Sequence, residues 1–341
     1  MGSQNPPIEV LESVQRIEPT MISSTEKIAD LIADLSSKAA TLGSALHPKT
    51  AVSLASLVRI MNCYYTNLIE GHKTRPKDIE RGLEGHWDQD PHRRNLQIEA
   101  TAHVRVQEHI DELAISKALP NPVSKEFLLN LHHQFYQGAP LEFLRVQGAG
   151  REFILVPGEW RSKSEHDVAV GRHEPPSSER VGEFMDYFSE TYTRHLASGK
   201  ATQLIALATS HHRFNYIHPF PDGNGRVSRL MSHAFALQIG VGANGLWSIA
   251  RGLARGIGSR SDYRQMMDHA DQPRRGDLDG RGNLSEHATR EFVEWFLSVC
   301  IDQIEFMSSL FDLKNIIDRI RAFVASENRF PVEAARLLEE A

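Results

Sequence analysis

Apolar residues recur every three or four positions along most of this chain, which is the spacing of one face of an α-helix. The first such series consists of Ile28, Leu31, Ile32 and Leu35. The same spacing predicts further helices over 50–71, 95–115, 124–137, 178–196, 201–216, 225–239, 259–270 and 286–310. The segment 138–176 differs, because short apolar runs alternate there with glycine and proline, as they do in strands and hairpins. We therefore expect a mostly α fold with one small β element.

The composition indicates a globular protein, because 40% of the 341 residues are hydrophobic and can form a substantial core. A formal net charge of -6 argues against a dedicated nucleic-acid-binding protein, so we expect no nucleic-acid partner for this part of the chain. The first residues show no secretory signal, and no apolar run is long enough for a membrane span. Two distant cysteines, Cys63 and Cys300, do not make a disulfide framework. These features favour a cytoplasmic protein without a membrane partner.

Three segments have weaker patterns. Residues 1–22 contain prolines and no clear period, so we expect a tail that packs on the surface. Residues 272–283 are polar and glycine-rich, as in a loop. The last residues, 329–341, have the pattern of an amphipathic helix after a short linker. That helix either caps the fold or begins a further, truncated domain.

The stretch HPFPDGNGRVSR, residues 218–229, contains an imidazole, a carboxylate and two guanidinium groups within twelve positions. His218 precedes a proline and therefore ends a helix. The glycine-rich turn 222–225 leads into the next helix, and backbone N–H groups at such a start form an anion site suited to phosphate. Arg226 and Arg229 are three residues apart, so both guanidinium groups can face the same ligand.

A carboxylate beside a phosphate site calls for a cation, and Asp222 with phosphate oxygens and waters would hold Mg²⁺. His218 is the candidate general base, since an imidazole titrates near neutral pH. Each feature alone is common as a helix end, a surface turn or a solvated face. Together they indicate transfer of a phosphate-containing group onto a nucleophile.

The stretch resembles the signature of the Fic family, HPFx[D/E]GNGRxxR, at every specified position. The segment 157–176 is similar to the family's flap hairpin and the segment that follows it, and 246–271 is similar to the region that closes its nucleotide pocket. The resemblance covers about residues 50–310 and implies a Fic-type helical bundle with a small β-hairpin flap. It divides the chain into an N-terminal helical extension (1–48), an inhibitory helix region packed on the core (49–90), a catalytic domain (91–311) and a C-terminal linker or helix (312–341).

Fic proteins transfer AMP from ATP to a hydroxyl side chain of a target protein and release pyrophosphate. The resemblance implies that His218 deprotonates the target hydroxyl and that Asp222 holds Mg²⁺ between the α- and β-phosphates. It also implies that Gly223, Asn224 and Gly225 form the anion hole and that Arg226 binds the phosphate chain. Arg229 would reach the γ-phosphate, and Tyr263 would contact the adenine. Tyr263 has the alternative of a simple core position. A target protein would dock on the flap around 158–171.

The sequence TNLIEG, residues 66–71, matches the inhibitory pattern [S/T]xxxE[G/N] of one class of Fic proteins. The resemblance makes Glu70 the inhibitory residue, and we expect its carboxylate to pair with Arg229. The alternative is an ordinary glutamate at the end of a helix.

Other functions remain open. The same residues would serve removal of AMP from a modified target, and a regulator that senses nucleotide would need a missing C-terminal domain for DNA or a partner. A homodimer is also compatible with the sequence. The adjacent histidines at 132–133 and 211–212 point in different directions on a helix, so we expect core or surface histidines rather than zinc ligands.

Overall fold

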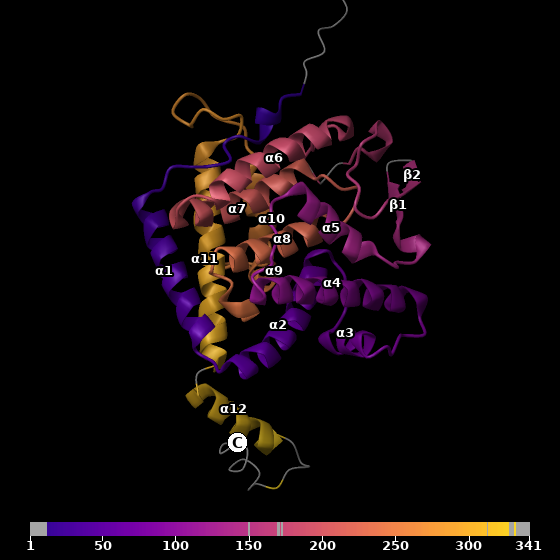
Figure 1. Cartoon of the computed structure of the whole chain (residues 1–341), viewed down its shortest axis with the longest axis vertical. Coiled ribbons are helices and arrows are strands. Elements are labelled where there is room, and N and C mark those ends of the chain that lie inside the picture. Colours follow the sequence, from indigo (N-terminus) through magenta and orange to yellow (C-terminus); the bar gives the residue numbers. More distant parts are fainter. Residues whose placement is uncertain are drawn as a thin grey trace, which may run out of the picture.

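The computed structural model describes residues 12–148, 151–168, 171, 173–311, 313–326 and 331. Within these residues the chain forms α-helices and one antiparallel pair of short strands (Figure 1). The helices are α1 Glu26–Ser44, α2 Pro48–Ile69, α3 Pro76–Leu83, α4 Pro91–Ile115, α5 Lys125–Tyr136, α6 Val181–Leu196, α7 Lys200–Ile217, α8 Asn224–Gln238, α9 Ile249–Arg255, α10 Asp262–Ala270, α11 Glu286–Phe311 and α12 Leu313–Ser326. The prediction of a mostly α fold with a small β element is confirmed.

Three of these helices were not predicted. Helices α3 and α9 have eight and seven residues, which is too short for a helical period to stand out. Helix α12 occupies much of the segment expected to be a short linker after 311, so that expectation is wrong. The helix predicted over 329–341 lies outside the described residues, apart from position 331.

The hairpin lies within 138–176, the segment predicted to contain the β element, but before the part that resembles the family's flap. Strand β1, Arg145–Gly148, pairs with β2, Arg151–Ile154, with Val146 opposite Phe153. The described part of 157–176, where the flap hairpin and the segment after it were expected, contains no strand: the chain there is a loop with one 3-10 turn and a single bridge residue at 173, so the hairpin expected there is wrong. Pro157 and Gly158, the latter at φ +85°, end the extended run after β2. The loop then returns to the hairpin, where His166 stacks on Phe153 with 4.5 Å between ring centroids.

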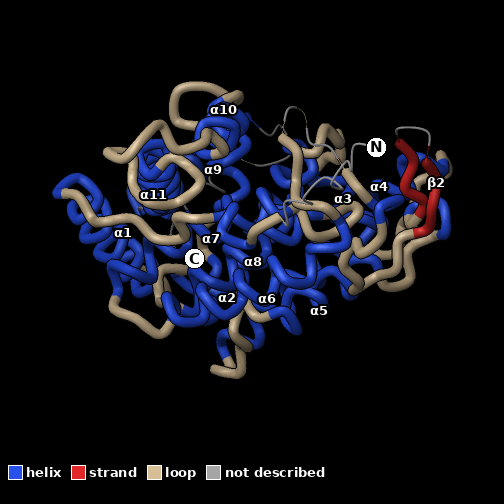
Figure 2. The backbone as a smooth tube through the Cα atoms, turned by 90° about the horizontal axis from the view of Figure 1, so that it is seen from above, coloured by secondary structure: helices blue, strands red, loops and turns tan. Residues whose placement is uncertain are grey.

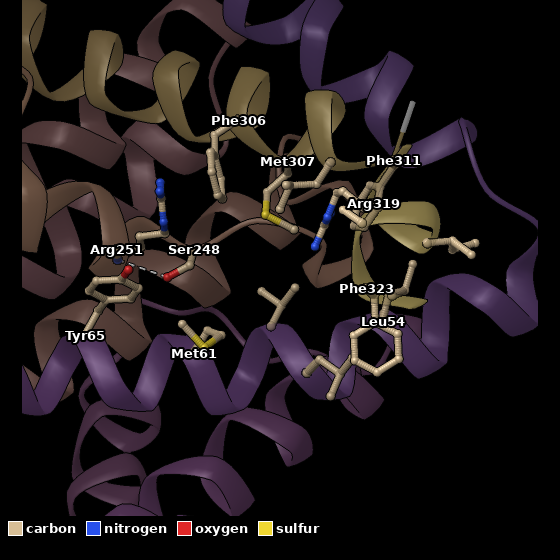
Figure 3. A pocket seen from close by; sticks show the side chains of 15 residues that line it. Leu54, Met61, Tyr65, Ser248, Arg251, Phe306, Met307, Phe311, Arg319 and Phe323 are labelled. Carbon is tan, nitrogen blue, oxygen red and sulfur yellow. Dashed lines mark hydrogen bonds between the residues drawn. The ribbon is translucent and has the colours of Figure 1, made fainter. Parts of the chain in front are cut away.

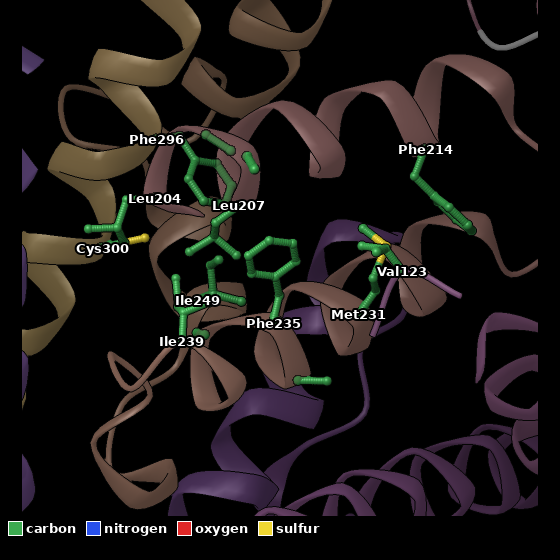
Figure 4. Close-up of a cluster of buried hydrophobic side chains, with 14 of the residues drawn as sticks. Val123, Leu204, Leu207, Phe214, Met231, Phe235, Ile239, Ile249, Phe296 and Cys300 are labelled. Atoms are coloured by element: carbon green, nitrogen blue, oxygen red, sulfur yellow. The ribbon is translucent and has the colours of Figure 1, made fainter. Parts of the chain in front are cut away.

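The centre of the molecule is built by α7 and α8. Every residue from Leu204 to Phe214 and from Arg226 to Ala236 is buried, because α8 packs against α4, α5, α7 and α9. Apolar side chains of several helices interlock around Phe235 (Figure 4), namely Leu204, Leu207, Met231, Ile249, Phe296 and Cys300. Helix α8 is therefore buried on all sides, and its polar residues need partners inside the protein.

The N-terminal segment is part of the same core. Helix α1 lies along α11, and Ile17 and Ile22 are buried in the main apolar cluster. The expectation of a surface tail is therefore wrong from Ile17 onward, while residues 1–11 lie outside the described part. The hairpin lies at the end of the molecule away from α1 (Figure 2). The division of the chain at 48, 90 and 311 stays a prediction, and the cluster includes residues from either side of the first two boundaries.

A large apolar groove of about 960 Å³ lies between α2 and the helices α9, α11 and α12 (Figure 3). The face that carries Leu54, Leu57 and Met61 forms one wall of this groove, and Leu57 is 54% exposed. Residues of α9, α11 and α12 form the other walls. The side of α2 toward the rest of the protein is small or polar, with buried Asn62 and Thr66. The groove holds no residue of the 218–229 motif, and no helix in the described residues could cross a membrane.

We expect Phe235→Ala to destabilise the protein strongly, because it leaves a cavity where α7, α8 and α9 meet. Truncation of a buried phenylalanine costs about 3–5 kcal/mol. Urea unfolding followed by circular dichroism gives the change in the free energy of unfolding. Leu278→Ala is the control, because Leu278 is fully exposed and its loss should change this free energy by no more than about 0.5 kcal/mol. Equal effects of the two substitutions would contradict the central position of α8.

Candidate active site

The motif forms a loop between the two central helices, and both of its ends have left-handed backbone. Helix α7 ends at His218, which has φ 51° and ψ 60° and donates its N–H to the Phe214 carbonyl at 3.0 Å. Helix α8 begins after Gly223, which has φ 83°. The His-Pro end and the glycine-rich start therefore lie where the sequence predicts them.

The Asn224 side chain closes this loop on itself. Its Oδ1 accepts from the Phe220 N–H at 2.8 Å, and its Nδ2 donates to the Phe220 carbonyl at 2.7 Å. Asn224 is buried, so its amide group has no freedom to bind a ligand. Any part of Asn224 in an anion hole is therefore its backbone N–H, one of the first N–H groups of α8, which lack partners within the helix.

Asp222 is held at the mouth of the loop by two donors. Its Oδ2 accepts from the Tyr136 hydroxyl at 2.6 Å and from Arg226 Nη2 at 2.8 Å. Burial alone would raise the pKa of Asp222, but Arg226, Tyr136 and the Gly223 N–H bring it down to about 2. The carboxylate is thus ionised, and its side chain is 51% exposed.

Arg226 is the centre of a buried network. Its guanidinium also donates to Tyr136 at 2.9 Å and pairs with Glu99 of α4. Burial opposes its charge, but Tyr136, Asp222 and Glu99 raise the pKa of Arg226 well above its ordinary value. Glu99 and Tyr136 were missed by the sequence reasoning. The signal for Glu99 was a carboxylate among the core positions of a predicted helix.

Glu70 and Arg229 form the predicted ion pair. Arg229 is 1% exposed, donates from Nη2 to Glu70 and from Nε to Thr66 Oγ1 at 3.3 Å. A Cβ atom at Gly225 would lie 2.5 Å from Glu70 Oε1, so the carboxylate lies directly against the start of α8 and requires glycine there. Burial opposes ionisation, but Arg229 and then Arg226 lower the pKa of Glu70. Glu70 is therefore an anion in the place where a helix start binds anions.

Two cavities flank the end of α2 beside Glu70. One of about 570 Å³ is lined both by apolar residues and an aromatic ring, among them Ile69, Leu253 and Tyr263, and by charged residues such as Arg260 and Asp268. The Tyr263 hydroxyl bonds His211 Nε2 at 2.8 Å, and burial raises the pKa of Tyr263 to about 12. Tyr263 is thus anchored in the core by its hydroxyl while the residue lines the cavity, and both predicted roles are compatible with this position.

The other cavity, of about 470 Å³, is polar. Glu70, His72, Glu99, Asp222 and Arg226 line it. No group of three or more histidine, cysteine or acidic residues in the described part of the chain could hold a metal by itself. An exposed, ionised Asp222 fits Mg²⁺ that takes its remaining ligands from phosphate oxygens and water.

His218 is half-buried, and its Nδ1 lies 3.4 Å from the Asn215 carbonyl. Burial, followed by the nearby positive charge of Arg161, lowers the pKa of His218 to about 4. The imidazole is therefore neutral near pH 7, which is the form a general base needs.

The four histidines of the adjacent pairs, which were expected to be core or surface residues, divide between core and surface. His132, His211 and His212 are buried, whereas His133 is exposed. His132 stacks on Phe220 at 3.8 Å, accepts the Gly158 N–H at Nδ1 and faces the Asp222 carbonyl with Nε2. This pattern belongs to a neutral ring protonated on Nε2. His132 therefore braces the motif loop.

Comparison with known proteins gives one family. Residues 122–236 match the model of the Fic/DOC family. The chain is 35% identical over 94 residues to the protein adenylyltransferase Fic of Nematostella vectensis and 36% identical over 84 residues to that of Drosophila virilis. The alignments cover 27% and 24% of this chain but only 20% and 16% of the relatives. The chain thus spans at most about a fifth of the length of these relatives.

Solved structures share the fold. A Fic family protein from Desulfovibrio desulfuricans has a TM-score of 0.59 at 19% identity, over 84% of this chain and 75% of that one. A Fic domain containing signaling protein from Bacteroides thetaiotaomicron has a TM-score of 0.60 at 19% identity, over 82% and 97%. At such identities the likeness concerns the fold alone.

We expect acid to destabilise this protein through its buried neutral histidines, and His103 of α4 provides the test. Burial, then Arg229 and Arg226, lower the pKa of His103 to about 3, and neither ring nitrogen has a partner among the described residues. Below pH 6.5 this histidine binds a proton in the unfolded chain but not in the folded one. The free energy of unfolding therefore decreases as the pH is lowered, by about 2 kcal/mol per such histidine at pH 5. Urea unfolding at pH 7.5 and pH 5 measures this loss.

His103→Leu should remove the contribution of one histidine. Between pH 7.5 and pH 5 the variant should lose about 2 kcal/mol less of its free energy of unfolding than wild type. His109→Leu, on the exposed side of the same helix, is the matched control and should keep the wild-type pH dependence. A His103→Leu variant with the full acid loss would show that His103 binds a proton in the folded state.

Proposed function

We propose, because this chain carries a Fic/DOC family domain, that it is a protein adenylyltransferase held in check by its own Glu70. The reaction transfers AMP from ATP to a hydroxyl side chain of a target protein or of the enzyme itself. The observation that carries the proposal is the Glu70 carboxylate against Gly225 and Arg229, within the motif that resembles the nucleotide site of Fic enzymes. The names of the aligned relatives support the same reaction class.

ATP would use the two cavities beside the end of α2. The adenine would lie in the cavity that Ile69, Leu253 and Tyr263 line, and the phosphates would lie at the start of α8, where the N–H groups and two buried guanidinium groups attract anions. Arg226 would bind the phosphate chain, and Arg229 the γ-phosphate. Asp222 would hold Mg²⁺, which supplies neutralisation of phosphate charge when bound.

His218 would act as the general base. Its neutral imidazole accepts the proton of the target hydroxyl as the hydroxyl oxygen forms a bond to the α-phosphorus. The bond from the α-phosphorus to the bridging oxygen breaks, and pyrophosphate leaves with that oxygen. The backbone N–H groups of Gly223, Asn224 and Gly225 stabilise the charge that develops on the phosphoryl oxygens.

Target docking involves the hairpin and the loop that follows it. The loop around 158–171, of which the structure describes 158–168 and 171, folds back on β2 through the stack of His166 on Phe153. An extended target segment can add to the free edge of such a hairpin by main-chain hydrogen bonds. This mode would bring a target hydroxyl toward His218 with little demand on the target sequence.

Inhibition follows from competition for one cation. Glu70 pairs with Arg229 and lies at the start of α8, so the γ-phosphate and the carboxylate would claim the same guanidinium. Two anions in a partly dry site repel each other strongly. ATP would then bind with its phosphates displaced, and the α-phosphorus would be out of line with the attacking hydroxyl.

Glu70→Gly should therefore raise incorporation of AMP by about tenfold or more, since 1.4 kcal/mol of barrier is one decade. The measurement is transfer of α-labelled AMP to the protein itself and to lysate proteins in the presence of Mg²⁺. Arg229→Ala in the Glu70→Gly background should stay inactive, because the γ-phosphate loses its anchor. His218→Ala in that background should lower transfer by about 10²–10⁴-fold.

Glu84→Gly is the matched control for this experiment. Glu84, like Glu70, follows the last residue of a helix and precedes a glycine with positive φ, but within the described part of the chain it pairs with the exposed His86 and with no arginine. It should leave AMP incorporation unchanged. Labelling absent from Glu70→Gly would refute the transferase, and labelling equal to wild type would refute the inhibitory role of Glu70.

Asp222→Ala should remove the Mg²⁺ dependence of ATP binding, because the exposed carboxylate is the proposed protein ligand of the ion. Calorimetric titration of ATP with and without Mg²⁺ measures this difference. Asp277→Ala, a substitution of a fully exposed aspartate outside the motif, should keep the wild-type response. An Asp222→Ala protein whose affinity for ATP still rises with Mg²⁺ as in wild type would contradict the metal assignment.

A further inference from the structure

A buried arginine outside the motif grips the backbone that carries His218. Arg161 Nε donates to the His218 carbonyl at 2.7 Å, and Nη2 donates to the Ile217 carbonyl at 3.0 Å. The backbone N–H of Arg161 donates to the Pro219 carbonyl at 2.9 Å. Three consecutive carbonyls thus accept hydrogen bonds from a single residue.

The rest of the guanidinium ties this backbone to the segment before α6. Nη1 donates to Ser178 Oγ at 2.9 Å, Nη2 also donates to the Pro176 carbonyl, and the Asp167 carboxylate lies 3.6 Å away. The Arg161 side chain is 1% exposed. A buried charge with this many bonds to backbone has a defined position, and it defines the position of its acceptors.

The backbone at His218 needs such support. Its φ of 51° lies in the left-handed region, which residues other than glycine rarely adopt. The last carbonyls of a helix have no donor within it, and Pro219 offers no N–H to the turn that follows. Strained conformations of this kind persist only where the surroundings enforce them.

The charged groups around the imidazole come from three other places in the fold. After burial, the Arg161 cation has the largest effect on the pKa of His218 and lowers it. His173, beyond the loop, lowers it further, and Asp222 of the motif raises it. Arg161 is therefore also the main cation that keeps His218 neutral.

We propose that Arg161 is a positioning residue for the base, which holds His218 in its left-handed conformation through the carbonyls of 217–219. The inference rests on the proposed function, since it gives the proposed base its geometry. It places the origin of that geometry in the loop 155–168, outside the motif.

Arg161→Lys and Arg161→Met, both made in the Glu70→Gly background, test this role. Lysine keeps the positive charge but cannot make the several hydrogen bonds of the guanidinium group. Methionine keeps a side chain of similar size without the charge or the hydrogen bonds. We expect kcat for AMP transfer to fall in both variants, by on the order of 10²-fold for a base displaced by about 1 Å. The KM for ATP should change by less than about threefold, because the start of α8 and its arginines are untouched. The acid limb of the pH–rate profile should move to higher pH with methionine and remain in place with lysine.

Imidazole NMR supplies a readout that does not need transfer. The His218 signal, assigned with His218→Ala, should titrate at higher pH in Arg161→Met than in Arg161→Lys or wild type. If Glu70→Gly protein transfers no AMP, the proposed function fails while this titration still decides the role of Arg161. Arg290→Lys, which changes an arginine paired along α11 with Glu286, is the control and should match its parent in every assay.

Three results would overturn the proposal. The first is a kcat in both Arg161→Lys and Arg161→Met that equals the kcat of the Glu70→Gly protein. The second is an unchanged His218 titration in Arg161→Met. The third is loss of ATP binding together with a lowered thermal midpoint in Arg161→Lys, which would indicate a general structural role. Should Arg161→Met fail to fold, the kcat and KM of Arg161→Lys decide.

Discussion

Two guanidinium groups buried at the start of a buried helix govern the rest of this structure. Arg226 and Arg229 are 5% and 1% exposed, and a charge at such a position is tolerated only with a partner. Helix α4 supplies Glu99, the motif supplies Asp222, and α2 supplies Glu70. The positions of α2 and α4 around α8 are therefore also the positions of counter-charges. Packing and electrostatics impose the same arrangement.

This requirement would give the proposed nucleotide binding and the proposed inhibition the same physical cause. A site with two buried cations at a helix start must contain an anion in every state of the protein. In the described structure the anion beside Arg229 is Glu70, and in the proposed catalytic state it would be a phosphate. The Glu70 carboxylate thus stabilises the unliganded site, and in the proposed mechanism it would compete with the phosphate for Arg229. Gly225 makes both occupancies possible, since a Cβ atom there would collide with the carboxylate.

The same cations shape the chemistry of the surrounding histidines. His103 and His211 lie near Arg229 in a dry interior, and burial with this positive charge lowers their pKa values to about 3. His218 lies near a different cation, Arg161, with the same consequence. A histidine that must act as a base benefits from such surroundings, because a neutral imidazole can accept a proton. Neutral histidines also pack against aromatic rings without the penalty of a buried charge.

The sequence by itself determined the helical character, most helix positions, and the set of groups from His218 to Arg229, because turns and helix starts depend on neighbouring residues. It also placed Glu70 at the end of a helix. The tertiary structure decided what these groups meet. Glu99, Tyr136 and Arg161 join the site from α4, α5 and a loop, and their local sequence does not show that they meet there. The hairpin lies at 145–154 rather than 157–176, and the apolar face of α2 borders a groove. Periodicity encodes which residues share a face, whereas the partner of that face depends on how distant segments pack.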